Sequence, residues 1–113
     1  MSVLIVDDHG AFRASAHTLL ELDGFDVVGE AADGASGLDL VRALKPDVVL
    51  LDIALPDMSG FDIAEQLTPG TNVVLTSSRQ SADFGKRVQR SGALGFIPKD
   101  QLSGEALRQL LAA

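Results

Sequence analysis

Five short runs of apolar, mostly β-branched residues alternate along this chain with segments in which apolar residues recur at helical spacing. The runs cover residues 3–6, 25–29, 48–53, 73–76 and 95–98. Most of them are continuously apolar, which is typical of strands covered on both faces. Because parallel neighbours in a sheet need a crossover connection, strict alternation of strands and helices predicts a parallel sheet with helices on both faces.

Helix start and stop signals support the same alternation. Serine at a helix start can accept a hydrogen bond from a free backbone N–H, whereas glycine and proline stand at helix ends. We expect one domain over residues 1–113 with no internal boundary and with a fourth helix over residues 81–91. The boundary residues are Ser59 and Ser103 at helix starts and Gly24, Pro46 and Gly92 at helix ends.

Composition excludes several classes of protein. The 113 residues include no cysteine, which removes disulfides, thiolate nucleophiles and cysteine-based zinc sites. The net charge is −7, and residues 1–78 carry 13 acidic side chains against 3 basic ones, so general nucleic-acid binding is not expected. No apolar run is long enough to span a membrane, and the first ten residues lack the pattern of a signal peptide. We therefore expect a cytoplasmic protein with no membrane contact.

The chemistry-bearing residues follow the predicted strands. Asp7 and Asp8 follow the first strand, Asp52 ends the third, hydroxyls at residues 76–78 end the fourth, and Lys99 follows the fifth. In open parallel sheets the binding crevice lies at the carboxyl ends of the strands, so these groups should meet there. Three carboxylates in one crevice repel each other unless a cation joins them.

Oxygen ligands select a hard cation, which makes Mg²⁺ the expected cofactor. An aspartate beside that cation can act as a nucleophile toward phosphorus, and a lysine can stabilise the charge on the transferring group. The strand ends therefore predict phosphoryl transfer onto a carboxylate.

Four motifs in order resemble the receiver domains of two-component response regulators, over essentially the whole chain. They are the acidic pair in Leu4–Asp8, the run Asp52–Gly60, the hydroxyls in Val74–Ser78, and Gly95–Lys99. The resemblance implies a flavodoxin-like (CheY-like) three-layer α/β/α sandwich with strand order 2-1-3-4-5. The last motif and the residues after it are most similar to receivers that precede a LuxR-type helix-turn-helix domain.

The resemblance also implies a role for each matching residue. Asp52 would be the phosphoacceptor, and Lys99 would pair with the phosphoryl group. Mg²⁺ would be held by Asp8 directly, by Asp7 partly through water, by Asp52, and by the backbone carbonyl of Ala54. A sensor histidine kinase would donate the phosphoryl group.

A hydroxyl and an aromatic side chain would switch the conformation. Ser77 matches the switch hydroxyl of the family, with Thr76 as an alternative, and Phe96 matches the aromatic that rotates inward. Their motion would change the face formed by the fourth helix, fifth strand and fifth helix. Gly60 matches the turn glycine that opens the third helix.

The sequence departs from the family pattern in two places. Many receivers carry proline after the active-site lysine, often with a cis bond, but here Pro98 precedes Lys99 and Asp100 follows. A cis bond before a residue other than proline costs about 3–4 kcal/mol, so the geometry of the Lys99–Asp100 bond stays open. The third helix is expected to be short, about two turns.

The predicted face of the fourth helix, fifth strand and fifth helix also carries a cluster of basic side chains. This cluster is either a solvated surface or part of a homodimer interface. It consists of Arg79, Lys86, Arg87 and Arg90, and Asp83 or Asp100 could pair with it across a two-fold axis. Binding of DNA through four charges beside an acidic body is not expected.

Other functions fit the sequence less well than phosphoryl signalling. Gly34–Gly37 is not a dinucleotide fingerprint, the loop after the first strand lacks the hydroxyls of a flavin site, and Asp52-Ile-Ala lacks the second acid of aspartate-based phosphatases. We therefore expect a phosphoacceptor signalling domain rather than an enzyme with its own substrate. The remaining alternative is a pseudo-receiver, an interaction module that keeps the fold without the phosphate chemistry.

Overall fold

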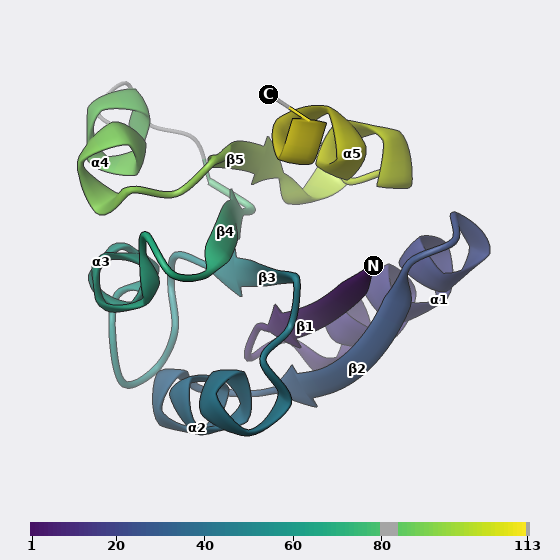
Figure 1. The fold of residues 1–113 in the computed structure, drawn as a ribbon, viewed down its shortest axis with the longest axis horizontal. Helices are drawn as coiled ribbons and strands as arrows, with labels where there is room; N and C mark the ends of the chain where they lie inside the picture. The colour runs from purple at the N-terminus through teal and green to yellow at the C-terminus, as the bar shows by residue number, and fades with distance from the viewer. Residues whose placement is uncertain (80–83, 113) are drawn as a thin grey trace.

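The strands form one five-stranded parallel sheet in the order β2-β1-β3-β4-β5. The computed structural model describes residues 1–79 and 84–112. This order confirms the predicted flavodoxin-like sheet, in which β1 lies beside both β2 and β3 (Figure 1). The strands are β1 (Ser2–Val6), β2 (Asp26–Ala31), β3 (Val48–Asp52), β4 (Asn72–Ser77) and β5 (Gly95–Pro98).

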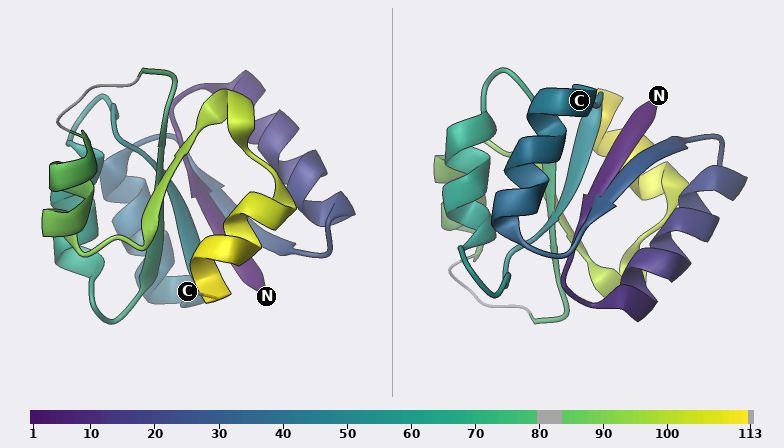
Figure 2. Two further views of the ribbon diagram at one scale, coloured as in Figure 1. Left: turned by 90° about the horizontal axis from the view of Figure 1, so that it is seen from above. Right: turned by 90° about the horizontal axis from the view of Figure 1, so that it is seen from below.

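Helices cover both faces of the sheet and make the predicted three layers. Figure 2 shows α1 and α5 on one side of the sheet and α2, α3 and α4 on the other. A 3₁₀ turn that the sequence analysis did not predict, η1 (Lys99–Gln101), follows β5 directly. The helices are α1 (Gly10–Leu22), α2 (Gly34–Leu44), α3 (Gly60–Leu67), α4 (Phe84–Ser91) and α5 (Gly104–Ala112).

The predicted boundary residues lie at the helix ends. The hydroxyl oxygen of Ser59 accepts the N–H of Phe61 at 3.2 Å, and that of Ser103 accepts the N–H of Ala106 at 3.0 Å. Gly24 and Gly92, just past α1 and α4, both have positive φ, as such positions require. α3 has eight residues, about two turns, as expected. The first part of the helix predicted over residues 81–91 lies outside the described residues.

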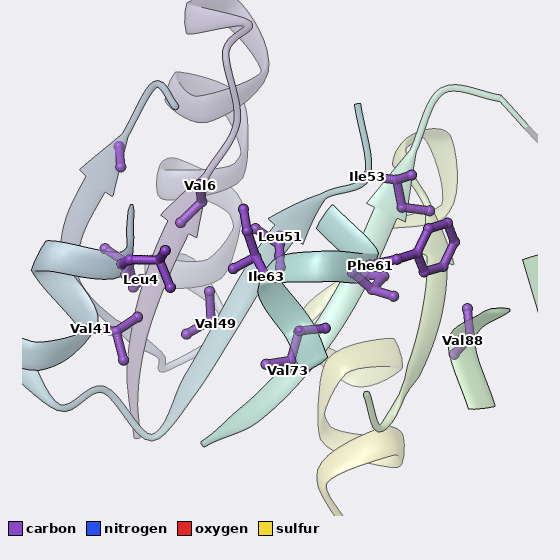
Figure 3. Packing of buried hydrophobic residues seen from close by; sticks show 14 residues of the cluster. Leu4, Val6, Val41, Val49, Leu51, Ile53, Phe61, Ile63, Val73 and Val88 are labelled. Atoms are coloured by element: carbon purple, nitrogen blue, oxygen red, sulfur yellow. The ribbon is translucent and has the colours of Figure 1, made fainter. Parts of the chain in front are cut away.

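The sheet separates two hydrophobic clusters. The first joins alternate residues of β1, β3 and β4 to α2, α3 and α4, and includes Leu4, Leu51 and Phe61 (Figure 3). The second lies under α1 and α5 and includes Ile5 and Leu50. All five residues of β3 are buried, which explains why its sequence is continuously apolar up to Asp52. Covered on both faces, the strands leave their carboxyl ends as the place where polar side chains gather.

Candidate functional site

Four of the predicted site residues meet at the carboxyl edge of the sheet. Asp7 and Asp8 follow β1, Asp52 is the last residue of β3, and Lys99 follows β5. The side chains of Asp7 and Asp52 are 0% and 3% exposed, whereas that of Asp8 is 34% exposed. The site therefore combines two buried carboxylates with one that is partly exposed.

Lys99 is the cation that joins the two buried carboxylates. Its Nζ lies 2.7 Å from Asp7 Oδ2 and 3.4 Å from Asp52 Oδ2. The contact with Asp7 is a close ion pair without the alignment of a hydrogen bond. The ammonium also lies 4.6 Å from the centre of the Phe12 ring, on α1. A buried charge is costly unless an opposite charge pairs with it. The single positive charge of Lys99 therefore neutralises only part of the negative charge of Asp7 and Asp52.

The local field disturbs the protonation of Asp52. Burial raises the pKa of Asp52, and the nearby charge of Asp7 adds to the rise. The N–H of Ala54, which donates to Asp52 Oδ1 at 3.2 Å, and the charge of Lys99 act in the opposite direction without cancelling it. Another positive charge at this site would stabilise the ionised form of Asp52.

His9 is a residue of the site that the sequence analysis did not predict. Its Nδ1 lies 3.2 Å from carboxylate oxygens of both Asp7 and Asp8, 4.0 Å from Asp52 Oδ2 and 3.3 Å from Lys99 Nζ. His9 stands at the N-cap position of α1, yet its side chain caps no backbone N–H there. The sequence feature that could have predicted it is its position directly after Asp7 and Asp8.

The donor set could hold a metal ion. Asp7, Asp8, His9 and Asp52 each place one ligand atom within 4.8 Å of the others. Three of the four are carboxylates, which suit a hard divalent cation. The predicted carbonyl ligand, Ala54, lies two residues beyond Asp52 in the adjoining loop.

The β3–α3 loop, residues 53–59, folds tightly against the end of β3. Ala54 pairs with Ser59 in an antiparallel bridge, and the N–H of Gly60 donates to Ile53 O at 2.8 Å. A Cβ on residue 60 would lie 2.4 Å from the backbone oxygen of Asp52, a distance that no side chain tolerates. Glycine at position 60 therefore permits the close return of the chain beside Asp52.

The strand register places Thr76, the alternative, rather than Ser77 on the same face of the sheet as Asp52. Asp52 is the direct partner of Thr76 in the parallel β3–β4 pair, so their side chains point to the same face. Thr76 is buried, and its hydroxyl has no hydrogen-bond partner among the described residues. Ser77 points to the other face, and its oxygen accepts the N–H of Arg79 at 3.0 Å.

Phe96 lies on the face of the sheet that carries α3 and α4. It is half-buried against the first cluster, and its ring meets Phe84 of α4 edge to face at 5.6 Å. Phe84 contacts Phe61 of α3 in the same manner at 5.9 Å. The three aromatic rings thus connect β5, α4 and α3.

Most of the predicted basic cluster lies on the exposed surface of α4. Arg87 stacks over Phe61 at 4.2 Å, while Lys86, Arg87 and Arg90 are all exposed on α4. Asp83, one of its two proposed partners, lies outside the described residues. Within residues 1–79 and 84–112 the single cis peptide bond is Thr68–Pro69, so the Lys99–Asp100 bond is trans.

Comparison with known proteins identifies the family. Residues 3–112 match the response regulator receiver domain family. The chain belongs to this family. The receiver domain is 43% identical over 103 residues to the nitrate/nitrite response regulator protein NarP of Escherichia coli, covering 87% of this chain and 47% of NarP. It is 34% identical to the response regulator GacA of Pseudomonas aeruginosa, covering 99% of this chain and 56% of GacA.

Solved structures agree with this assignment. The signal receiver domain of NarL from Mycobacterium tuberculosis superposes with a TM-score of 0.88 at 36% identity, covering 98% of this chain and 93% of that one. A two-component response regulator of the LuxR family from Aurantimonas superposes with a TM-score of 0.87 at 28% identity, covering 98% and 82%. The receiver domain spans about half the length of the curated relatives it matches.

Among the described residues, none of the helices has the length and hydrophobicity to cross a membrane.

Proposed function

We propose that this receiver domain accepts a phosphoryl group from a sensor histidine kinase on Asp52. The observation that carries the proposal is the buried Asp52 carboxylate, which lies beside Asp7 and 3.4 Å from Lys99 Nζ at the carboxyl edge of the sheet. A carboxylate oxygen of Asp52 attacks phosphorus, the bond between phosphorus and the kinase histidine breaks, and Asp52 becomes an acyl phosphate. The imidazole nitrogen of the kinase leaves with the electron pair of the broken bond.

The residues at this edge fit Mg²⁺. Two buried carboxylates share Lys99 and a third, partly exposed carboxylate lies beside them, so the site has an excess of negative charge. Asp7, Asp8 and Asp52, with the carbonyl of Ala54, would hold the cation, and His9 stands beside them. Bound there, Mg²⁺ would supply positive charge for the phosphoryl oxygens.

Lys99 orients and neutralises the incoming group. Its ammonium already lies 3.4 Å from Asp52 Oδ2, so it can move with the phosphoryl oxygens while Asp7 keeps it in the site. Lysine suits this task because its compact charge can follow an oxygen without a fixed geometry.

We assign the switch hydroxyl to Thr76 rather than Ser77. The unpartnered hydroxyl of Thr76 lies on the same face as Asp52 and can donate to a phosphoryl oxygen. We expect phosphorylation to move Thr76 and to rotate Phe96 inward, which would break the contact of Phe96 with Phe84 and change the α4–β5–α5 face. That face is the proposed surface for output or homodimer formation, with the basic residues of α4 and Asp100 at its rim.

The test is the intact mass after incubation with acetyl phosphate and Mg²⁺. One added phosphoryl group on the wild type, absent in Asp52→Asn and in EDTA, would support the proposal. Equal labelling of Asp52→Asn would place the acceptor elsewhere, and no labelling would favour a pseudo-receiver. Thr76→Ala and Ser77→Ala should both be labelled, but only Thr76→Ala should lose the phosphorylation-dependent change in the amide signals of Phe96.

A further inference from the structure

One side chain fastens the β3–α3 loop to the start of α2. Asp57 Oδ1 accepts the N–H of Gly34 at 2.8 Å, and Asp57 Oδ2 accepts the N–H of Ala35 at 3.0 Å. These donors belong to the first turn of α2, where backbone N–H groups have no partner within the helix. The two bonds hold the pKa of Asp57 below its usual value, in keeping with a carboxylate at the positive end of a helix dipole.

A close side-chain contact reinforces this connection. A Cβ on Gly34 would lie 2.6 Å from Sδ of Met58 and 2.9 Å from Cδ1 of Ile63. The absence of a side chain at Gly34 therefore lets Met58, the residue after Asp57, pack directly on the helix start. The loop is held to α2 by two hydrogen bonds and by this contact.

The base of the same loop carries the phosphoacceptor and a proposed cation ligand. Ala54 donates its N–H to Asp52 Oδ1 and pairs with Ser59 across the loop. Only Leu55 and Pro56 separate Ala54 from Asp57, and the ring of Pro56 limits backbone rotation, so we expect a displacement of Asp57 to reach Ala54.

We propose that Asp57 is a positioning residue that latches the β3–α3 loop to α2 and thereby sets the Ala54 carbonyl for the cation. The inference rests on the proposed function, since it assigns Asp57 a part in the proposed Mg²⁺ site. Linkage makes the effect reciprocal: cation binding at Ala54 stabilises the first turn of α2 through Asp57. The amides of Gly34 and Ala35 then report on a site that they do not touch.

The structure offers a matched control in Asp33. Asp33 also caps α2, accepting the N–H of Ser36 at 2.8 Å, but it precedes that helix and does not belong to the β3–α3 loop. Asp57→Ala and Asp33→Ala both remove a carboxylate that bonds the helix start. If Asp57 positions the loop, only Asp57→Ala should weaken Mg²⁺ binding. If both residues act only as helix caps, the two variants should have the same Mg²⁺ affinity.

The experiment combines Mg²⁺ titration calorimetry with amide hydrogen exchange on the intact chain. In the wild type, Mg²⁺ should slow exchange at Gly34 and Ala35. Asp57→Ala should weaken Mg²⁺ binding about tenfold or more and abolish that slowing. Asp33→Ala should keep Mg²⁺ affinity within about twofold of the wild type. Asp57→Asn, which retains one acceptor oxygen, should fall between wild type and Asp57→Ala, and it decides the matter if Asp57→Ala does not fold.

The outcomes separate this inference from the proposed function. Wild-type Mg²⁺ affinity in Asp57→Ala, or in Asp57→Asn if that variant alone folds, would overturn the latch while leaving phosphoryl transfer to Asp52 intact. Equal weakening in Asp33→Ala and Asp57→Ala would reduce Asp57 to a helix cap and also overturn it. A wild-type chain that binds no Mg²⁺ and takes no label from acetyl phosphate would remove the proposed function itself, and the latch with it.

Discussion

At the scale of single residues, burial gives Asp52 a pH dependence of known sign. Its pKa is raised in the native state, chiefly by burial, so the native chain holds this proton more tightly than the unfolded chain. The stability that this provides is present below the ordinary aspartate pKa, about 3.9, and is lost as pH rises through the raised native value.

Asp52→Asn should therefore be more stable than the wild type at pH 7 in EDTA, and equal to it below about pH 4. Each 1 kcal/mol of difference corresponds to roughly 4 °C in Tm for a domain of this size. Thermal unfolding of both proteins across this pH range measures it. Parallel pH profiles for the two proteins would show that Asp52 does not carry the effect.

The glycine beside Asp52 provides a second residue-scale prediction. In Gly60→Ala the new Cβ would meet the backbone of Asp52 and Ile53, which cannot move as a flexible side chain can. We expect a loss of about 1–3 kcal/mol in the free energy of unfolding, measured by urea titration.

Gly85→Ala is the matched control, because a Cβ there meets nothing within 4 Å and the position is exposed on α4. It should be neutral or stabilising by up to about 1 kcal/mol. A loss in Gly85→Ala as large as that in Gly60→Ala would mean that the close approach to Asp52 is not the cause.

Site residues whose positions follow from strand order could be predicted from the sequence. Those whose positions depend on strand register or on the path of a loop could not. Asp7, Asp52 and Lys99 follow apolar strands directly, so their meeting at one edge follows from strand order alone. The face on which Thr76 points depends on the β3–β4 register, which periodicity along one strand does not give. The reach of His9 and Asp57 depends on how loops fold back, and no local pattern encodes that.

At the scale of elements, α4 is attached to the body more weakly than α3, in which four of eight residues are buried. Of the eight residues of α4 only Val88 and Ser91 are buried, and Phe84 adds edge-to-face contacts with Phe61 and Phe96. An element with few buried contacts opens locally before the whole domain unfolds, and a switch surface requires such an element. The exposed Arg87 adds one cation–π contact with Phe61, which contributes about 0.5–1 kcal/mol at an exposed site.

Phe84→Ala should therefore speed amide exchange in α4 while leaving exchange in α2 unchanged. Each aromatic contact contributes about 0.5–1.5 kcal/mol beyond the area it buries, so α4 exchange should rise at least several-fold. Hydrogen exchange followed by NMR measures both helices in one sample. An equal acceleration in α2 would indicate global destabilisation instead of local loosening.

The helices and strands were largely predictable because the spacing of their apolar residues matches the positions that are buried. All five strands lie where the apolar runs predicted them, with ends that differ from the prediction by at most two residues. The turn η1 was missed because Lys99–Gln101 has no apolar periodicity, and its position is fixed by the end of β5.

At the scale of the whole molecule, a parallel sheet gathers negative charge at one edge. Residues 1–78 hold 13 acidic and 3 basic side chains, and the carboxyl ends of β1 and β3 bring three of these acids together. Folding thus brings like charges together around Lys99, at a cost that a bound divalent cation would offset. Stability of the entire domain should therefore depend on Mg²⁺.

Mg²⁺ should raise the Tm above that in NaCl of equal ionic strength, because a ligand that binds only the folded state stabilises it. At a concentration 100 times its Kd the gain is about 2.7 kcal/mol. Asp7→Asn should lose most of this gain. Asp39→Asn, which removes the same charge from the exposed face of α2, should keep it.

The same titration should reverse the pH dependence that Asp52 imposes. Saturating Mg²⁺ holds the Asp52 carboxylate ionised, so the domain should gain stability between pH 4 and pH 7 where the metal-free domain loses it. Thermal scans at several pH values with Mg²⁺ and with EDTA test this directly. Because the reversal requires cation and Asp52 in one site, its absence alongside a normal rise in Tm would place the bound Mg²⁺ away from Asp52.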